Sequence, residues 1–374
     1  MSQYSDVMVI GGGPAGCSTA LRLRQQGATV TLIEKSDYSQ QRPGESLAPE
    51  AIGFLNQLGV RDRFDAEAFQ QTSGLLVSWG SVGISFSSFL TRPFGSGWNL
   101  DRARFDRMLS HACRQSSVKV VFSRQSIQFV YSHDRWELQV GRDSYRSPVI
   151  VDATGRASAM ATRFGVQRIH DDHLIALVSY RDEQSCDPRL VIESTPDGWW
   201  YSAGLPGDVS VTAFLTDVDL IPKRPEERTT YFTELLEQTR FAHRGIAPSS
   251  PAFSPRLVRA NTSRLSRPSS SHWFAVGDAA IATSPLSGNG IVRALETGLL
   301  AADAIVSTDT NASQRYNEVL ASMREESEAQ ARATYSQEKR WATTFWQRRH
   351  STLPSIKSPL VQRAVGTVIP NPQS

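Results

Sequence analysis

The chain has 374 residues, of which 40% are hydrophobic and 21% charged, and its formal net charge is +3. This ordinary globular composition allows one or two domains and excludes the strong basic bias of nucleic-acid-binding proteins. No apolar run approaches the ~20 residues of a membrane span and no signal peptide precedes the first strand, so we expect a cytoplasmic protein.

The first predicted elements are a buried strand at Val7–Ile10 and a helix that begins near Pro14. Between them, Gly11, Gly13 and Gly16 match the G-x-G-x-x-G pattern in its informative position, between a strand and a helix. The first glycine permits a tight turn, the second lets a pyrophosphate approach the backbone, and the third allows close helix packing. The helix N-terminus adds N–H groups and partial positive charge. The alternative is a βαβ unit with incidental glycines.

A second apolar strand, Ala28–Glu34, follows the helix and ends in an acid. Glu34 lies close to the ~20-residue offset from the glycines expected for the acid that holds a ribose hydroxyl. Strand, glycine loop, helix, strand and acid together predict a dinucleotide site. Cys17 follows the loop and is interpreted as a small buried thiol, and with Cys113 and Cys186 it forms neither a disulfide framework nor a metal-ligand pattern.

The next stretch is a rigid Pro43-Gly44 turn flanked by Arg42 and Glu45, before a short helix that Gly59 ends. Arg42 and Glu45 either line the cofactor or form a solvated loop with an incidental ion pair. The residues alone leave both interpretations open.

Further elements follow from apolar periodicity. Asp101 suits the N-cap of a helix whose apolar face includes Phe105 and Leu109. The other predicted elements up to residue 146 are strands within 73–89, a strand at 118–122, and two or three short antiparallel strands within 126–146.

Two later strands end, like the first, at glycine and aspartate. One leads into Asp152-Ala-Thr-Gly155 and the other into Gly277-Asp278. Such strand ends on an open sheet are where ligands gather. The loop Pro285–Gly290 then opens a predicted helix at 291–306, whose N-terminus again offers N–H groups to an anion or a carbonyl oxygen.

The region between these strand ends has a different pattern. Residues 175–216 are strand-rich and punctuated by turns, which predicts a mostly antiparallel sheet in a second domain or layer. A helix is predicted at 225–238, and the Pro-, Ser- and Arg-rich stretch 248–268 is interpreted as a connection back to the first domain. Residues 314–349 predict one long charged helix with an aromatic and basic end.

These motifs, in this order, resemble those of FAD-dependent monooxygenases and halogenases of the para-hydroxybenzoate hydroxylase fold. The matching stretches are Gly11–Gly16 with Glu34, Arg42–Ser46, Asp101–Asp106, Asp152–Gly155, and Gly277-Asp278 with Pro285–Gly290. The resemblance implies FAD as the cofactor. It also implies an α/β fold, with a Rossmann-like FAD-binding domain of the glutathione reductase type, an inserted, mostly antiparallel β-sheet substrate domain, and a C-terminal helical segment.

The implied domain organisation is discontinuous. The FAD-binding domain comprises residues 1–72, 98–165 and 265–310, the substrate domain 73–97 and 166–264, and the C-terminal helical segment 311–374.

The resemblance also assigns roles to single residues. It places Gly11–Gly16 at the pyrophosphate, Glu34 at the adenosine ribose, Asp278 near the ribityl chain, and Pro285, Gly288, Asn289 and Gly290 beside the flavin ring. It identifies no catalytic side chain. The full set of expected cofactor contacts is Gly11, Gly13, Pro14, Ala15, Gly16, Glu34, Lys35, Arg42, Glu45, Ser46, Arg102, Asp278, Pro285, Gly288 and Gly290.

Within that family the motifs resemble two branches. The flavin-dependent halogenases share the Gly-Glu-Ser stretch, but their two signature tryptophans are absent before Pro206 and no lysine lies between Lys35 and Lys119. Without an amine to hold the oxidised halogen, halogenation is disfavoured. The other branch comprises small flavoproteins that mature the tryptophan-derived quinone cofactors of lysine ε-oxidase and glycine oxidase. The stretches Gly44–Leu47, Gly198–Tyr201 and Arg340–Arg349 resemble that branch.

The resemblance implies that reduced FAD and O2 supply one oxygen atom to an electron-rich ring. The preferred hypothesis is hydroxylation of a protein-bound tryptophan in a partner precursor, during biogenesis of a cysteine tryptophylquinone-like cofactor. The alternatives are a hydroxylase, halogenase or reductase of a small aromatic or isoprenoid metabolite, and a non-catalytic escort protein, which the intact glycine and acid motifs disfavour. Asp152-Ala-Thr-Gly155 differs from the Asp-Gly motif of NADPH-using hydroxylases, which favours an external reductant or a flavin reductase.

A protein substrate needs an open face, and aromatic and arginine side chains favour such interfaces. The candidates are Trp199, Trp200, Tyr201, Trp341, Phe345 and Trp346. For Trp199 and Trp200 we favour the alternative that they belong to the core of a sheet. For the C-terminal aromatics a partner face and a packed helix remain equal alternatives.

Overall fold

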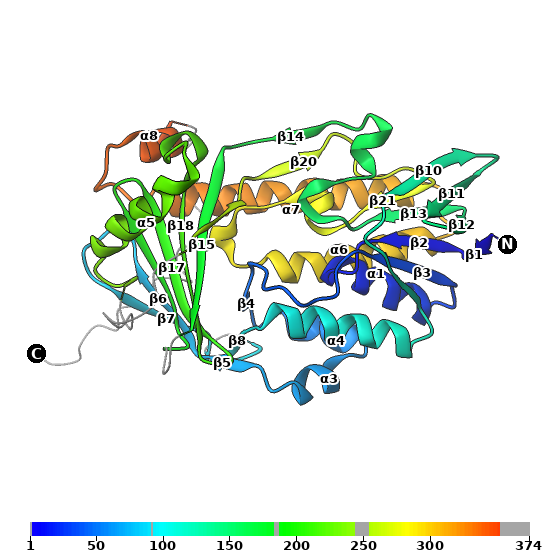
Figure 1. The fold of residues 1–374 in the computed structure, drawn as a ribbon, viewed down its shortest axis with the longest axis horizontal. Coiled ribbons are helices and arrows are strands. Elements are labelled where there is room, and N and C mark those ends of the chain that lie inside the picture. Colours follow the sequence, from blue (N-terminus) through cyan, green and yellow to red (C-terminus); the bar gives the residue numbers. More distant parts are fainter. Residues whose placement is uncertain (1, 91–92, 183–186, 244–253, 352–374) are drawn as a thin grey trace, which may run out of the picture. The chain divides into compact units, whose positions relative to one another are not determined.

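The computed structural model describes residues 2–90, 93–182, 187–243 and 254–351, so Cys186 and the end of the chain lie outside the described residues. The chain divides into two compact units (Figure 1). Unit 1 comprises Met1–Phe69, Leu100–Asp172 and Asn261–Glu325, and unit 2 comprises Gln70–Asn99, His173–Ala260 and Glu326–Ser374. The domain boundaries drawn from the sequence remain predictions.

The centre of unit 1 is a five-stranded sheet in the order β21-β13-β2-β3-β9, in which every neighbouring pair is parallel. Its strands are β21 (Trp273–Ala275), β13 (Val149–Asp152), β2 (Val7–Ile10), β3 (Val30–Glu34) and β9 (Lys119–Phe122). Both faces of a parallel sheet are covered, which explains why β2 is apolar throughout and fully buried.

Helices α1 (Pro14–Gln25), α4 (Arg102–Gln115) and α6 (Gly290–Val306) accompany this sheet. Small residues bring α1 and α6 together, since Ser18 Oγ donates to Leu295 O at 2.6 Å. The predicted N-cap of α4 is confirmed, because the side chain of Asp101 accepts a hydrogen bond from Arg104 N. Unit 1 also contains two shorter helices, α2 (Ala51–Gln57) and α3 (Arg61–Ala66).

Unit 1 contains two smaller sheets. One has the order β1-β12-β11-β10 and the other β14-β20-β22. Their strands are β1 (Gln3–Tyr4), β10 (Ile127–Ser132), β11 (Arg135–Val140), β12 (Asp143–Ser147), β14 (Arg168–His170), β20 (Ser263–Leu265) and β22 (Ile281–Ala282). The antiparallel strands predicted within 126–146 are thus confirmed.

Unit 2 is built on a seven-stranded sheet in the order β19-β15-β18-β17-β16-β6-β7. Its neighbours are antiparallel except for β16 and β6, which confirms the mostly antiparallel sheet. Its strands are β6 (Gly74–Ser78), β7 (Ser85–Ser88), β15 (Leu174–Asp182), β16 (Leu190–Thr195), β17 (Gly198–Leu205), β18 (Val209–Asp217) and β19 (Arg256–Arg259); β5 (Gln70–Thr72) pairs separately with β8 (Gly97–Asn99).

The stretch 248–268 does lead from unit 2 back to unit 1, since unit 2 ends at Ala260 and unit 1 resumes at Asn261. Its second half also forms β19 and β20, two strands that the sequence did not predict. β19 pairs with β15 and β20 pairs with β14. Pairing with partners so far away in the sequence leaves no trace in local composition.

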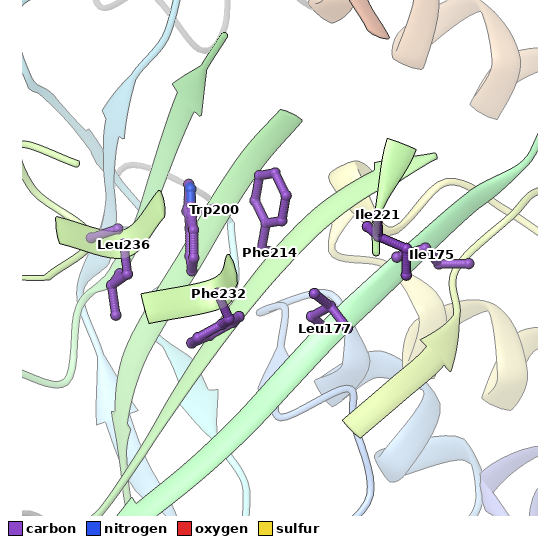
Figure 2. Packing of buried hydrophobic residues seen from close by; sticks show 8 residues of the cluster. Ile175, Leu177, Trp200, Phe214, Ile221, Phe232 and Leu236 are labelled. Atoms are coloured by element: carbon purple, nitrogen blue, oxygen red, sulfur yellow. The ribbon is translucent and has the colours of Figure 1, made fainter. Parts of the chain in front are cut away.

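One face of the seven-stranded sheet carries a hydrophobic core cluster of unit 2 (Figure 2). The ring of Trp200 lies 4.8 Å from that of Phe214 and 4.9 Å from that of Phe232, on helix α5 (Arg228–Glu237). Ile175, Leu177 and Leu236 extend the same cluster. Because the apolar side chains of α5 pack on this cluster, their spacing in the sequence was sufficient to predict the helix.

The prediction of one helix over 314–349 is wrong. Helix α7 runs over Ala312–Tyr335, and a separate helix α8 covers Thr344–His350. The interruption contains Glu338, whose buried carboxylate accepts hydrogen bonds from Gly80 N and Ser194 Oγ. These partners lie far away in the sequence, so helical periodicity could not reveal the break. Among the described residues no helix is both long and apolar enough to cross a membrane.

Candidate functional site

Four strand ends of unit 1 meet at one edge of the five-stranded sheet, because parallel strands present their carboxyl ends together. β2 leads into Gly11, β3 ends at Glu34, β13 ends at Asp152, and β21 leads into Gly277-Asp278. The three strand breaks recognised in the sequence therefore form one region.

The three motif glycines have different surroundings. Gly11 has φ +107°, and a Cβ there would lie 2.2 Å from Ala153 O. A Cβ on Gly16 would lie 1.9 Å from Gly11 O, whereas a Cβ on Gly13 would meet nothing within 4 Å. Gly11 and Gly16 thus make the turn and the close packing possible, and Gly13 borders open space. No side-chain hydrogen bond caps α1 at Gly13.

Glu34 is buried against this loop. Its Oε2 accepts a hydrogen bond from Gly12 N at 2.5 Å and its Oε1 accepts one from Ser36 N at 2.6 Å. A carboxylate offers about four acceptor positions, so these two bonds leave capacity for hydroxyl donors. Tyr38 Oη donates to Gly12 O at 2.8 Å and holds the loop from the other side. Tyr38 is a support that no sequence pattern signalled.

The thiol of Cys17 faces the same loop and donates to Gly12 O at 3.2 Å. Its hydrogen bond with Cys113, together with burial, raises the pKa of Cys17 well above the usual range. The side chain is therefore an uncharged buried thiol, as its position on the helix indicated.

The Pro43-Gly44 turn is tied to α4 by Arg102. Its Nη1 donates to Pro43 O at 2.8 Å, and its Nη2 lies 3.2 Å from Asp106. Arg42 lies between two buried carboxylates, 4.0 Å from Glu34 and 3.9 Å from Asp106. The turn is therefore anchored by charge. Asp106 was part of a recognised motif, but its position between two arginines was not foreseen.

The carboxylates at the other two strand ends differ in their hydrogen-bond and ion-pair partners. Asp152 accepts hydrogen bonds from Thr154 N, Met160 N and Ala161 N, each at 3.0 Å, so it organises its own turn. Asp278 is partly buried, and its carboxylate lies 3.1 Å from Arg156 Nε. Arg156 directly follows the Asp152–Gly155 motif and was not predicted as a site residue.

The second glycine loop begins α6. Ser284 Oγ accepts from Leu286 N and starts a 3₁₀ turn at Pro285–Ser287, after which Gly288 takes φ +64°. A Cβ on Gly288 or Gly290 would meet nothing within 4 Å. The α6 N-terminus, like that of α1, has no side-chain cap. Two uncapped helix N-termini beside open backbone and a buried acid fit a dinucleotide.

The remaining predicted contacts occupy varied positions. Pro14 and Ala15 form the buried start of α1, Lys35 is exposed beyond β3, and Glu45 is buried with its Oε2 accepting Gly44 N. Ser46 begins the short strand β4 (Ser46–Leu47) and is half-buried. Pro285 and Asn289, in the loop before α6, are half-buried as well.

The predicted partner face in unit 2 needs correction. Trp199, Trp200, Phe345 and Trp346 are fully buried, so their side chains cannot form an exposed surface. Adjacent residues of β17 point to opposite faces of the sheet, which places Trp200 in the core beside α5 and Trp199 in a second cluster. Of the six candidates, Tyr201 and Trp341 retain partial exposure.

The second cluster, here called the aromatic cluster, consists of Trp79, Trp199, Tyr335, Phe345 and Trp346. Trp199 Nε1 donates to Tyr335 Oη at 3.2 Å, and the rings of Trp79 and Trp346 lie 5.4 Å apart. Its aromatic and indole N–H contacts pack α8 and the end of α7 against strands of unit 2.

Two buried acids reinforce this packing. Asp217 forms ion pairs with Arg348 at 3.0 Å and with Arg349 at 2.8 Å. Burial raises the pKa of a carboxylic acid, but at Glu338 the hydrogen bonds from Arg340 and Ser194 outweigh burial and lower its pKa to about 2. The aromatic and basic ending is thus a packed structural element.

Comparison with known proteins agrees with this geometry. The model of the family described as FAD binding domain matches residues 4–334. LodB of Marinomonas mediterranea, which bears the name of an FAD-dependent oxidoreductase, is 30% identical over 363 residues, covering 94% of this chain and 98% of LodB.

Two solved structures share the fold. The flavin-dependent halogenase CmlS has a TM-score of 0.82 at 23% identity, covering 97% of this chain and 69% of CmlS. The peptidyl tryptophan dihydroxylase QhpG, essential for tryptophylquinone cofactor biogenesis, has a TM-score of 0.79 at 22% identity, covering 95% of this chain and 80% of QhpG.

Proposed function

The chain belongs to the FAD-binding domain family and is an FAD-dependent oxidoreductase of the monooxygenase–halogenase type, and from this premise we propose that it hydroxylates a protein-bound tryptophan. The substrate is a partner precursor that acquires a tryptophylquinone-like cofactor. Bound FAD supplies the oxygen-activating chemistry, and the protein supplies binding, orientation and charge.

Each predicted contact then has a task. The α1 N-terminus and the open backbone at Gly13 hold the pyrophosphate, and Glu34 accepts hydrogen bonds from ribose hydroxyls. Asp278 binds along the ribityl chain. Backbone N–H groups of Gly288–Gly290, at the positive end of α6, stabilise negative charge on the flavin ring.

The exposed positions of the lysines favour oxygen transfer over halogenation. The four lysines in the described part of the chain, Lys35, Lys119, Lys223 and Lys339, are all exposed. An amine that holds an oxidised halogen must be kept from bulk water, since water would consume the reagent. Oxygen transfer needs no such amine.

The protein-bound substrate rests on two similarities. LodB matches this chain over nearly the full length of both proteins, and QhpG, which acts on a peptidyl tryptophan, has the same fold. Because Asp152-Ala-Thr-Gly155 differs from the Asp-Gly motif of NADPH-using hydroxylases, we assign the supply of electrons to an external reductant or flavin reductase.

The test is co-expression with the precursor of a lysine ε-oxidase or glycine oxidase type enzyme from the same genome. The intact mass of the precursor should rise by the mass of one or more oxygen atoms. Gly13→Val should abolish this gain together with the flavin absorption band, because its side chain fills the space left for the pyrophosphate. Gly53→Val is the matched control, since a Cβ at Gly53 also meets nothing within 4 Å.

Three outcomes contradict the proposal. A panel of free aromatic compounds that accelerates NAD(P)H oxidation would indicate a small-molecule hydroxylase. Halide incorporation into the precursor would indicate a halogenase. A purified chain without a flavin band would indicate a binding or escort protein.

A further inference from the structure

The two edges of the seven-stranded sheet in unit 2 differ in their protection. An edge strand exposes unpaired N–H and C=O groups, and proteins commonly guard such edges with charged side chains. β19, at one edge, begins and ends with Arg256 and Arg259. β7, at the other edge, reads Ser-Phe-Ser-Ser and carries no charge.

The uncharged character extends well beyond β7. Between Glu67 and Arg92 the sequence has no charged residue, although 21% of the whole chain is charged. This stretch forms β5, β6 and β7. Within the seven-stranded sheet, β7 and its neighbour β6 therefore carry no charged residue. Arg240 reaches the loop between them, where its Nη1 donates to Val82 O at 2.8 Å.

The same edge exposes apolar side chains. Val82 is 65% exposed, Phe86 49% and Leu90 64%. The ring of Phe86 lies over Gly74 of the neighbouring strand, since a Cβ on Gly74 would come within 2.9 Å of it. The ring is thereby held on the sheet face at the edge. In the described part of the chain, β6 is the one strand that pairs with β7.

We propose that β7 is the docking edge for the protein substrate, which adds an extended, uncharged segment to the sheet as a further strand. Main-chain hydrogen bonds to β7 supply affinity, and Phe86 contacts alternate apolar side chains of the added segment. Because β7 itself carries no charge, it favours an uncharged segment, since a charged one would lose water along β7 without gaining an ion pair from that strand. The identity of the partner as the quinone-oxidase precursor rests on the proposed function.

The test copies the protection of one edge onto the other. Ser85→Arg with Ser88→Arg gives β7 the same first and last residues as β19. In the full-length protein this variant should raise the Kd for the purified precursor at least about tenfold. Phe86→Lys is a second variant that removes the apolar contact while leaving Ser85 and Ser88 intact.

The matched control is Leu257→Ser on β19, a site of similar exposure (42%), which should leave the Kd unchanged. Hydrogen exchange at the amides of β7 should slow when the precursor binds. Unchanged Kd values in both β7 variants would overturn the proposal. So would a wild-type dimer, seen by sedimentation, that the β7 variants dissociate, because the edge would then belong to a second copy.

Binding and oxygen gain are scored separately. Binding that depends on β7 without oxygen gain contradicts the proposed function alone. Oxygen gain with β7-independent binding contradicts the docking edge alone. If neither binding nor oxygen gain is observed, both proposals are contradicted.

Discussion

The glycine loops of unit 1 are predicted from the sequence to contact a cofactor, and Phe345 and Trp346 of the aromatic cluster in unit 2 are equally compatible with a partner face and a packed helix. The two regions turn out to be built in opposite ways. At Gly13, Gly288 and Gly290 an added Cβ would meet open space. At Trp199 and Trp346 the side chains are fully buried among other rings. The first region leaves room for a ligand, and the second is filled by the chain itself.

This difference shows what kind of sequence signal is reliable for function. A glycine motif reports backbone conformation and missing side-chain volume, which are local properties. A run of aromatic and basic residues reports only side-chain chemistry, and the same chemistry serves an interface or a core. Three predictions follow the contrast between open and filled regions.

The largest effect is expected at Gly16, where an added Cβ has no room. Gly16→Ala places a Cβ 1.9 Å from Gly11 O, a backbone clash that no rotamer can relieve. The free energy of unfolding should fall on the order of 4 kcal/mol, or folding should fail. Gly53→Ala, in open space on α2, should change it by less than about 1 kcal/mol. Chemical denaturation measures both, and equal effects would contradict the assignment of Gly16 to close packing.

The next effect is at the buried acid beneath α8. Asp217→Ala leaves Arg349 without its carboxylate partner, and breaking such a buried pair should cost roughly 3 kcal/mol. Asp219 also binds Arg348 but is exposed, so Asp219→Ala should cost less than about 1 kcal/mol. If thermal unfolding showed the two variants alike, the C-terminal helix would not depend on its buried ion pair.

The smallest effect is a dependence on pH. The pKa of Glu338 is lowered from 4.5 to about 2 in the folded chain, so its stabilising contribution is present above pH 4.5. It should be lost progressively as the pH falls from about 4.5 to about 2, by an amount on the order of 2 kcal/mol. The difference in unfolding free energy between the wild type and Glu338→Gln should shrink across this range. The pKa of Asp219 is also lowered to about 2, but Asp219 is present in both proteins and its effect cancels in this difference. A difference that stayed constant over the range would contradict the role of Glu338.

Much of unit 1 could be predicted from local sequence. Gly11–Gly16, Glu34 and the Asp101 cap lie where strand and helix patterns placed them, because each depends on neighbours close in the chain. The supports Tyr38 and Arg156 could not be predicted, since their partners Gly12 and Asp278 are defined only when separate strand ends meet.

The sequence by itself determined the parallel sheet, the glycine loops at its edge and the family, because strand runs, missing Cβ atoms and short spacings are local. The sequence also favoured a core position for Trp199 and Trp200, which the structure confirms. Only the tertiary structure decided that Phe345 and Trp346 are core, that the helix predicted over 314–349 breaks around Glu338, and that β7 is an edge strand without charged residues. Each of these depends on contacts between segments far apart in the chain. Burial, and therefore the use of a side chain for packing or for recognition, is a property of those contacts.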